Sequence, residues 1–104
     1  MVQAERGRAE GRRWRQLKTR IIRRDAGICH ICGRPGADSA DHLIPEALGG
    51  PRWDPANLAA VHHTVWPRCN IIRGSRPIDE ARTDIARILK RDEATLTTTG
   101  AWDW

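Results

Sequence analysis

The chain has 104 residues, a formal net charge of +5 and 39% hydrophobic residues, with no Phe and no Tyr. A domain of this size buries only about 60% of the surface of its unfolded chain, so we expect one domain with a thin core that a bound metal stabilises. Three cysteines that cannot all pair within the chain, no apolar run near the roughly 20 residues of a membrane span, and an arginine-rich N-terminus without a signal-peptide pattern indicate a cytoplasmic protein with reduced thiols.

Positive charge is concentrated at the N-terminus. Up to Arg24 there are nine basic and two acidic residues, a balance of +7; the rest of the chain has nine basic and eleven acidic residues, a balance of −2. Sixteen of the eighteen basic residues are arginine, whose planar guanidinium suits bidentate contact with phosphate. This pattern favours a polyanionic partner. A solvated, partly disordered tail is the alternative interpretation.

Residues 1–11 lack apolar periodicity, and we expect them to form a flexible basic arm. From Arg12 to about Asp25, apolar residues recur at i, i+3, i+7 and i+8, which predicts an amphipathic helix. Gly27 can take a positive φ and end that helix. Trp14 heads the apolar stripe, so we interpret it as a core residue. The stripe consists of Trp14, Leu17, Ile21 and Ile22.

A Cys-x-x-Cys pair follows the first helix. Cys29 and Cys32, followed by Gly33, can bind one tetrahedral zinc ion. A redox-active pair would need a thioredoxin-like context, which the sequence does not indicate. A closed zinc site needs two more ligands, and the remaining candidates are Cys69 and the histidines. We expect His30, between the two cysteines, to point to solvent.

The middle of the chain predicts a hairpin and a helix. Residues 39–45 form a short strand, 46–56 a loop rich in Gly and Pro, and 58–61 the second strand. A helix over 62–73 follows, although Pro67 must disturb its regularity.

A second amphipathic helix is predicted near the C-terminus. Ser75 and Pro77 mark its start, and it runs to about Lys90. We expect its apolar stripe to pack on the first helix; the stripe consists of Ile78, Ala81, Ile85, Ile88 and Leu89. Residues 95–104 have no periodic pattern. Their Trp102 and Trp104 either fold back on the domain or form an exposed docking peptide.

Taken together, these motifs resemble the HNH endonucleases, in particular the small zinc-containing phage and bacterial type in its HNN variant. The resemblance covers about residues 14–74 and rests on the order of Cys-x-x-Cys, Asp41-His42, Gly49-Gly50, Asn57-Leu58, Cys69-Asn70 and Arg73-Gly74. It implies an α+β fold of the ββα-metal type: a hairpin with a zinc knuckle, packed on a helix and flanked by N- and C-terminal helices. The expected nuclease domain spans 12–92, with its motif core at 27–74 and a tail at 93–104.

The resemblance implies a DNA endonuclease that hydrolyses phosphodiester bonds with one divalent cation. His42 would be the general base, since an imidazole can accept a proton at neutral pH. Asp41 and Asn70 would present oxygen ligands to Mg²⁺ or Mn²⁺, and Asn57 would pin the loop that aims His42. The expected setting is a bacterial host cell, in phage packaging, restriction or mobility. A phage terminase or other packaging protein is a possible partner, and a monomer is favoured.

The same resemblance implies a structural zinc site formed by Cys29, Cys32, His62 and Cys69. Six residues separate His62 from Cys69, which indicates an insertion, and His63 remains an alternative ligand. We expect residues 64–68 to bulge as a loop whose Trp66 covers the zinc or packs on the first helix. The expected DNA contacts come from Arg12, Arg13, Arg15, Arg20, Arg68 and Arg73.

Two other functions compete with the nuclease. A zinc-stabilised DNA-binding module without catalysis would keep the basic arm and the zinc ligands, but it would not need Asp41, His42 and Asn70. An adaptor of a packaging machine would use the C-terminal helix and the tryptophans.

Overall fold

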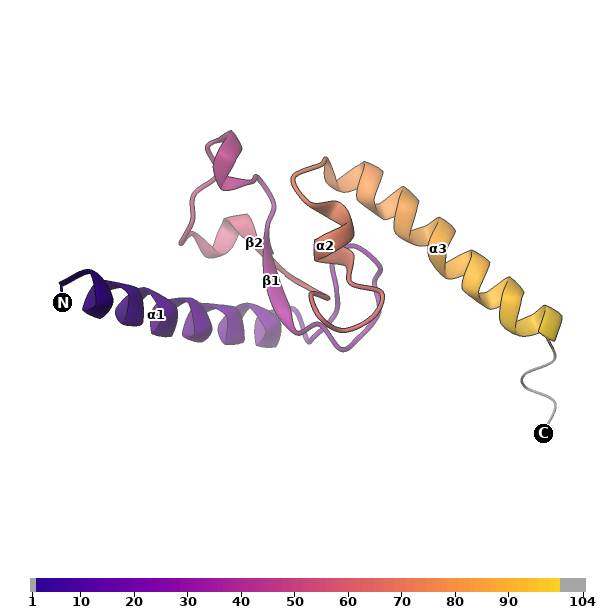
Figure 1. The fold of residues 1–104 in the computed structure, drawn as a ribbon, viewed down its shortest axis with the longest axis horizontal. Coiled ribbons are helices and arrows are strands. Elements are labelled where there is room, and N and C mark those ends of the chain that lie inside the picture. The colour runs from indigo at the N-terminus through magenta and orange to yellow at the C-terminus, as the bar shows by residue number, and fades with distance from the viewer. Residues whose placement is uncertain (1, 100–104) are drawn as a thin grey trace.

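A two-stranded antiparallel hairpin lies at the centre of the molecule (Figure 1). In this computed structural model, which describes residues 2–99 and the side chains of 9–93, β1 (Ser39–His42) pairs with β2 (Leu58–Val61). Ala40 lies opposite Ala60, and His42 lies opposite Leu58. The predicted second strand is confirmed, and the first strand ends before Pro45. The architecture is mixed α+β.

Helix α1 (Val2–Arg24) packs against both strands of the hairpin. It begins well before the predicted start at Arg12, because the preceding segment is rich in Ala, Glu, Gln and Arg, which favour helix. Leu17 and Ile21 form a core cluster with residues of both strands. The helix ends as predicted: Gly27 takes φ +70°, and its N–H donates to the Ile22 carbonyl at 2.8 Å.

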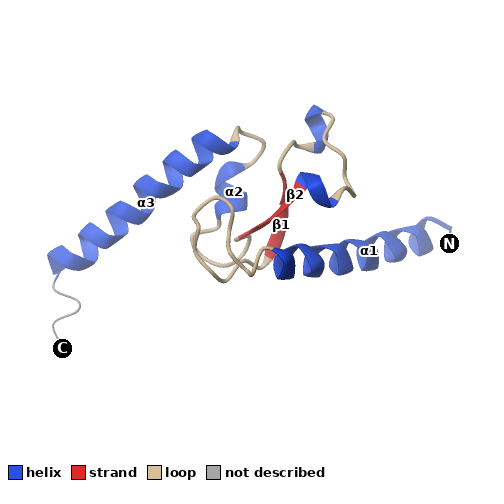
Figure 2. Ribbon diagram, turned by 180° about the vertical axis from the view of Figure 1, so that it is seen from behind, coloured by secondary structure: helices blue, strands red, loops and turns tan. Residues whose placement is uncertain are grey.

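The last two helices lie on the other side of the hairpin. Helix α2 (Cys69–Arg73) is much shorter than the predicted helix over 62–73, because residues 63–68 form a loop. Helix α3 (Ile78–Thr99) packs on α2, and its Ala81 and Ile85 join the core around the cysteines. The expectation that α3 packs on α1 is therefore wrong. Figures 1 and 2 show the two long helices at opposite ends of a molecule that measures 58 × 30 × 26 Å.

Helix α3 continues beyond the predicted end near Lys90. Trp102 and Trp104, which were expected to fold back or to form a docking peptide, lie outside the described residues. Between residues 2 and 99, no helix is long and apolar enough to cross a membrane.

Candidate metal centre and the Asp41–His42 site

Four side chains from three parts of the chain converge on one point. Cys29 and Cys32 come from the knuckle after α1, His62 follows β2, and Cys69 opens α2; their ligand atoms all lie within 4.8 Å of one another. The His62 Nδ1 atom lies 3.3 Å from the Cys32 Sγ atom and 4.0 Å from the Cys69 Sγ atom. Ligands of a tetrahedral zinc ion are separated by about 3.5–3.8 Å. The cluster therefore fits a metal such as zinc, and His62, rather than His63, supplies its nitrogen.

The surroundings of His62 support this assignment. Its Nε2 atom donates to the Pro35 carbonyl at 2.9 Å, which directs Nδ1 toward the sulfur atoms. Metal-binding histidines ordinarily make such a second hydrogen bond, because it fixes the ring and the tautomer. His62 is 1% exposed, and the three cysteines are free thiols.

The close packing of the thiols separates their acidities. A hydrogen bond with Cys69 lowers the pKa of the Cys29 thiol to about 4, against the opposing effect of burial. The same bond raises the pKa of Cys69, and burial raises the pKa of Cys32. Without a metal, these shifts favour a thiolate at Cys29 and protonated thiols at Cys32 and Cys69. A bound dication would stabilise all three thiolates, so metal binding and folding are coupled.

The loop over 63–68 accommodates the unusual spacing of the last two ligands. The Asp38 carboxylate accepts hydrogen bonds from the backbone N–H of His63 at 2.6 Å and from the Thr64 hydroxyl at 2.6 Å. Burial opposes ionisation of Asp38, but these bonds outweigh it and lower the pKa of Asp38 to about 2. The Asn70 N–H closes the loop by donating to the His62 carbonyl at 2.9 Å. Trp66 is 51% exposed on this loop and belongs to neither core cluster.

Asp41 points inward from β1 and is held from two sides. Its Oδ2 atom accepts from the Arg73 Nη1 atom at 2.6 Å and from the His30 Nε2 atom at 2.9 Å. Asp41 is 7% exposed. Among the described residues, both hydrogen bonds to this carboxylate go to Oδ2, which leaves Oδ1 uncommitted. The prediction that His30 points to solvent is wrong, because its side chain is only 11% exposed.

Arg73 was expected to contact DNA, and this prediction is also wrong. Arg73 is 2% exposed, and its remaining hydrogen bonds go to three backbone carbonyls: His42 at 2.7 Å, Leu43 at 2.8 Å and Arg76 at 2.9 Å. The guanidinium therefore ties α2 to the end of β1. No sequence pattern distinguishes such an arginine from a surface one.

His42, the neighbour of Asp41, points to the other face of the hairpin. Its Nε2 atom donates to the Arg52 carbonyl at 3.1 Å, and its ring stacks on Trp14 with centroids 5.6 Å apart. The Glu46 carboxylate lies 3.9 Å from the same Nε2 atom. Within the described part of the chain, no hydrogen bond uses His42 Nδ1, and the side chain is 23% exposed.

Asn57 holds the loop that carries the Arg52 carbonyl. Its Oδ1 atom accepts from the Ile44 N–H at 2.9 Å, and its Nδ2 atom donates to the carbonyls of Ile44 at 3.0 Å and Pro51 at 3.1 Å. The loop is so closely drawn together that a Cβ atom at Gly50 would overlap the Ile44 carbonyl oxygen and lie 2.6 Å from the carbonyl carbon. The loop geometry around His42 thus depends on one buried amide and one glycine.

Asn70 has a different partner from Asp41 and His42. Its Nδ2 atom donates to the His63 Nδ1 atom at 3.1 Å, so its Oδ1 atom is not used in that bond. Asn70 lies three residues before Arg73 in α2, and residues at this spacing share a helix face. Because Arg73 reaches Asp41, this face of α2 is turned toward β1. Asp41 and His42 are neighbours on β1 with side chains on opposite faces of the hairpin, and among the described residues no hydrogen bond joins Asn70 to either of them.

The other predicted DNA-binding residues are exposed; they are Arg12, Arg13, Arg15, Arg20 and Arg68. On α1, a shallow hollow is lined by Arg15, Gln16, Thr19, Arg20 and Arg23. This face presents guanidinium groups along successive turns of one helix.

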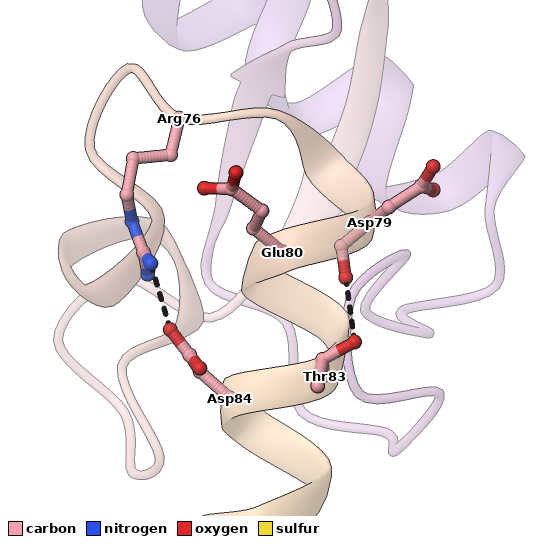
Figure 3. A pocket seen from close by; sticks show the side chains of 5 residues that line it. All are labelled: Arg76, Asp79, Glu80, Thr83 and Asp84. Atoms are coloured by element: carbon pink, nitrogen blue, oxygen red, sulfur yellow. Dashed lines mark hydrogen bonds and ion pairs between the residues drawn. The ribbon is translucent and has the colours of Figure 1, made fainter.

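A second hollow lies at the start of α3 (Figure 3) and contains acidic side chains. Arg76 pairs there with Asp84 at 2.7 Å and donates to the Ile72 carbonyl at 2.8 Å. These contacts fix the corner between α2 and α3. We therefore assign this hollow a structural role.

Comparisons of the chain with protein-family models, with curated proteins and with solved structures found no match.

Proposed function

We propose that the protein is a metal-dependent DNA endonuclease of the HNH type, with a ββα-metal core formed by β1, β2 and α2. The observation that carries this proposal is the orientation of His42. Its Nε2 atom donates to the Arg52 carbonyl at 3.1 Å, which places the proton of the neutral imidazole on Nε2 and leaves Nδ1 as the acceptor. Within the described residues Nδ1 has no hydrogen-bond partner, so it can take a proton from a water molecule.

The loop contacts support this role for His42. A general base must be held in one orientation, because a misplaced group loses much of its effect. Asn57 supports the loop through Ile44 and Pro51, and Pro51 precedes the residue whose carbonyl holds His42. Asn57 is therefore a supporting residue of the catalytic site.

Asp41 and Asn70 have the donor chemistry that a hard divalent cation prefers. Each keeps a side-chain Oδ1 atom outside the hydrogen bonds that hold it: Asp41 is bound through Oδ2 and Asn70 through Nδ2. Carboxylate and amide oxygens suit Mg²⁺ or Mn²⁺. When bound, such a cation would neutralise charge on the phosphate and assist the departing 3′ oxygen.

The exposed arginines of α1 supply a binding surface for the proposed substrate. Guanidinium groups bind phosphate oxygens and thereby position DNA, without reading its sequence. The Arg13 guanidinium lies over the Trp53 ring, Trp53 meets the edge of Trp14, and Trp14 stacks on His42, so this end of the arginine surface is continuous with the proposed base. Weakening of DNA binding with rising salt is expected.

A zinc-stabilised DNA-binding module without catalysis is the second candidate. The pairing of Arg73 with Asp41 at 2.6 Å favours it, because a buried guanidinium repels a cation that approaches the same carboxylate. This function needs only the arginines of α1 and the cysteine–histidine cluster.

Incubation of the zinc-loaded protein with supercoiled plasmid, in Mg²⁺, in Mn²⁺ and in EDTA, separates the two functions. We expect nicking that requires the added divalent ion. His42→Ala should lower the rate by about 100-fold or more, since general-base catalysis contributes factors of about 10²–10⁴. DNA binding without nicking in either ion would contradict the nuclease and favour the binding module.

The His42→Ala result needs two controls. The variant should keep its zinc content and its affinity for DNA, so that the loss can be assigned to chemistry. Leu48→Ala is a matched change in the same loop, because Leu48 is 70% exposed, and it should cleave as fast as the wild type. Equal cleavage by His42→Ala and wild type would remove His42 as the base.

A further inference from the structure

The imidazole of His42 lies against an aromatic ring from outside the motif that contains it. The rings of His42 and Trp14 are stacked, with centroids 5.6 Å apart and planes inclined by 13°. This is within the separation at which aromatic pairs attract one another beyond the effect of burial. The contact joins α1, which carries the arginines, to β1.

Trp14 is itself fixed by its other neighbours. It packs against a buried cluster that contains Leu17 and Leu58. It also meets the edge of Trp53, with centroids 6.4 Å apart and planes inclined by 64°. The Arg13 guanidinium lies 4.1 Å from the centre of the Trp53 ring. Trp14 therefore offers His42 a rigid surface.

The contacts of His42 complement one another. The hydrogen bond from Nε2 to the Arg52 carbonyl fixes one edge of the ring, and the stack with Trp14 fixes its plane. Together they determine both side-chain torsions of His42 and leave Nδ1 uncommitted. A base of bound DNA could not stack on this face of Trp14 unless His42 moved away.

We propose that Trp14 is a positioning residue that orients the His42 imidazole, so that α1 completes the catalytic site as well as binding DNA. This inference rests on the proposed nuclease function. A residue that only fills the core would affect stability, and a residue that binds DNA would affect affinity. A positioning residue changes kcat while the affinity for DNA stays the same.

Kinetics of Trp14→Leu and Trp14→Phe test the proposal. We expect Trp14→Leu to lower kcat about tenfold, because the imidazole loses one of its two constraints. KM, DNA affinity and zinc content should stay within twofold. Trp14→Phe should restore most of kcat, because it retains an aromatic face. Trp66→Leu is the matched control, since Trp66 is 51% exposed on the loop over 63–68, away from His42. It should leave kcat unchanged.

NMR provides a readout that does not depend on cleavage. In the wild type, the carbon-bound protons of the His42 ring should show cross-peaks to Trp14 and an upfield ring-current shift. The shift should disappear in Trp14→Leu and persist in Trp14→Phe. Because the cross-peaks are measured in the wild type, a variant that fails to fold does not prevent the test.

Each result has a defined meaning. A wild type that does not cleave would remove the proposed function and the kinetic role of Trp14, while the NMR data would still decide whether Trp14 orients His42. Cleaving protein without the ring-current shift would overturn this inference alone. A loss of DNA affinity at unchanged kcat in Trp14→Leu would also overturn it and would identify Trp14 as a DNA contact.

Discussion

The two core clusters of this molecule are stabilised in different ways. Beneath α1, ordinary apolar contacts suffice, among Leu17, Ile21, Ala40 and Leu58. Beneath α3, the buried cluster includes the thiols of Cys29 and Cys69, together with Ile31, Val61, Ala81 and Ile85. Removal of a metal would leave the α3 side with crowded thiols in its interior. We infer that the α1 side depends on apolar burial and the α3 side on metal binding.

The candidate site lies where these two sides meet. His30 comes from the metal-binding knuckle, Arg73 from α2, and both bind Asp41 on β1. The backbone of His30 is also held, because its carbonyl accepts from Arg82 of α3 at 3.0 Å. Among the described residues, the His30 Nδ1 atom is the one buried side-chain nitrogen or oxygen without a partner. The orientation of Asp41 thus depends on the side that needs the metal.

Loss of the metal should produce the largest effect and test whether the α3 side depends on it. His62→Ala removes a ligand, whereas His63→Ala changes an exposed neighbour outside the cluster. Binding of structural zinc contributes on the order of 10–16 kcal/mol of apparent free energy. We therefore expect His62→Ala to lose zinc and cooperative unfolding, as measured by metal analysis and circular dichroism.

His63→Ala should retain one zinc per chain and unfold cooperatively. A chelator should convert the wild type into the state of His62→Ala. Cooperative thermal unfolding of the metal-free wild type, with unchanged helix content, would contradict the view that the α3 side needs a metal.

Arg73→Met should produce the next largest effect, because it breaks the link between the two sides. It leaves the buried Asp41 carboxylate without its guanidinium partner, and loss of one member of a buried ion pair costs about 3–5 kcal/mol. We expect this decrease in the free energy of unfolding, measured with denaturant in excess zinc. Arg68→Met is the matched control at the start of the same helix; Arg68 is exposed, so its change should stay within about 0.5 kcal/mol.

Asp41→Asn in the Arg73→Met background sharpens this test. Removing the unpaired charge should recover part of the lost stability, because the uncompensated carboxylate is the main source of the cost. No recovery in the double variant would indicate that Arg73 acts mainly through the carbonyls of His42 and Leu43.

The sequence predicts the elements better than their partners. The second strand follows from the short apolar run at 58–61, and the pair Cys29 and Cys32 from its spacing, which are local signals; the ligands His62 and Cys69 came from the family resemblance. Asp41 is 11 residues from His30 and 32 residues from Arg73. From residue type and sequence neighbours alone, a histidine between two cysteines and an arginine in a basic chain are both expected at the surface. Their burial is decided by a carboxylate distant in sequence.

The pairing of the helices could not be predicted for a related reason. Periodicity identifies the apolar face of α3 but not the surface that will cover it, and that surface includes the buried thiols of the knuckle. The early start of α1 reflects local helix propensity without an apolar stripe. Helix α2 is short because the Asp38 carboxylate accepts hydrogen bonds from His63 and Thr64 and so holds the segment after β2 in a loop.

Gly50→Ala should produce the smallest of these effects and confine it to the α1 side. The added Cβ would overlap the Ile44 carbonyl oxygen and lie 2.6 Å from its carbon and 3.0 Å from the Asn57 Nδ2 atom, so the loop backbone must shift at a cost of about 1–3 kcal/mol. We expect NMR shift changes around His42 and Arg52, with zinc content unchanged. Gly11→Ala is the matched control: its Cβ would meet nothing within 4 Å, and alanine within a helix should add about 0.5–1 kcal/mol. Zinc should be retained because the loop over 43–57 supplies no metal ligand; loss of zinc from Gly50→Ala would contradict the expectation that the effect stays on the α1 side.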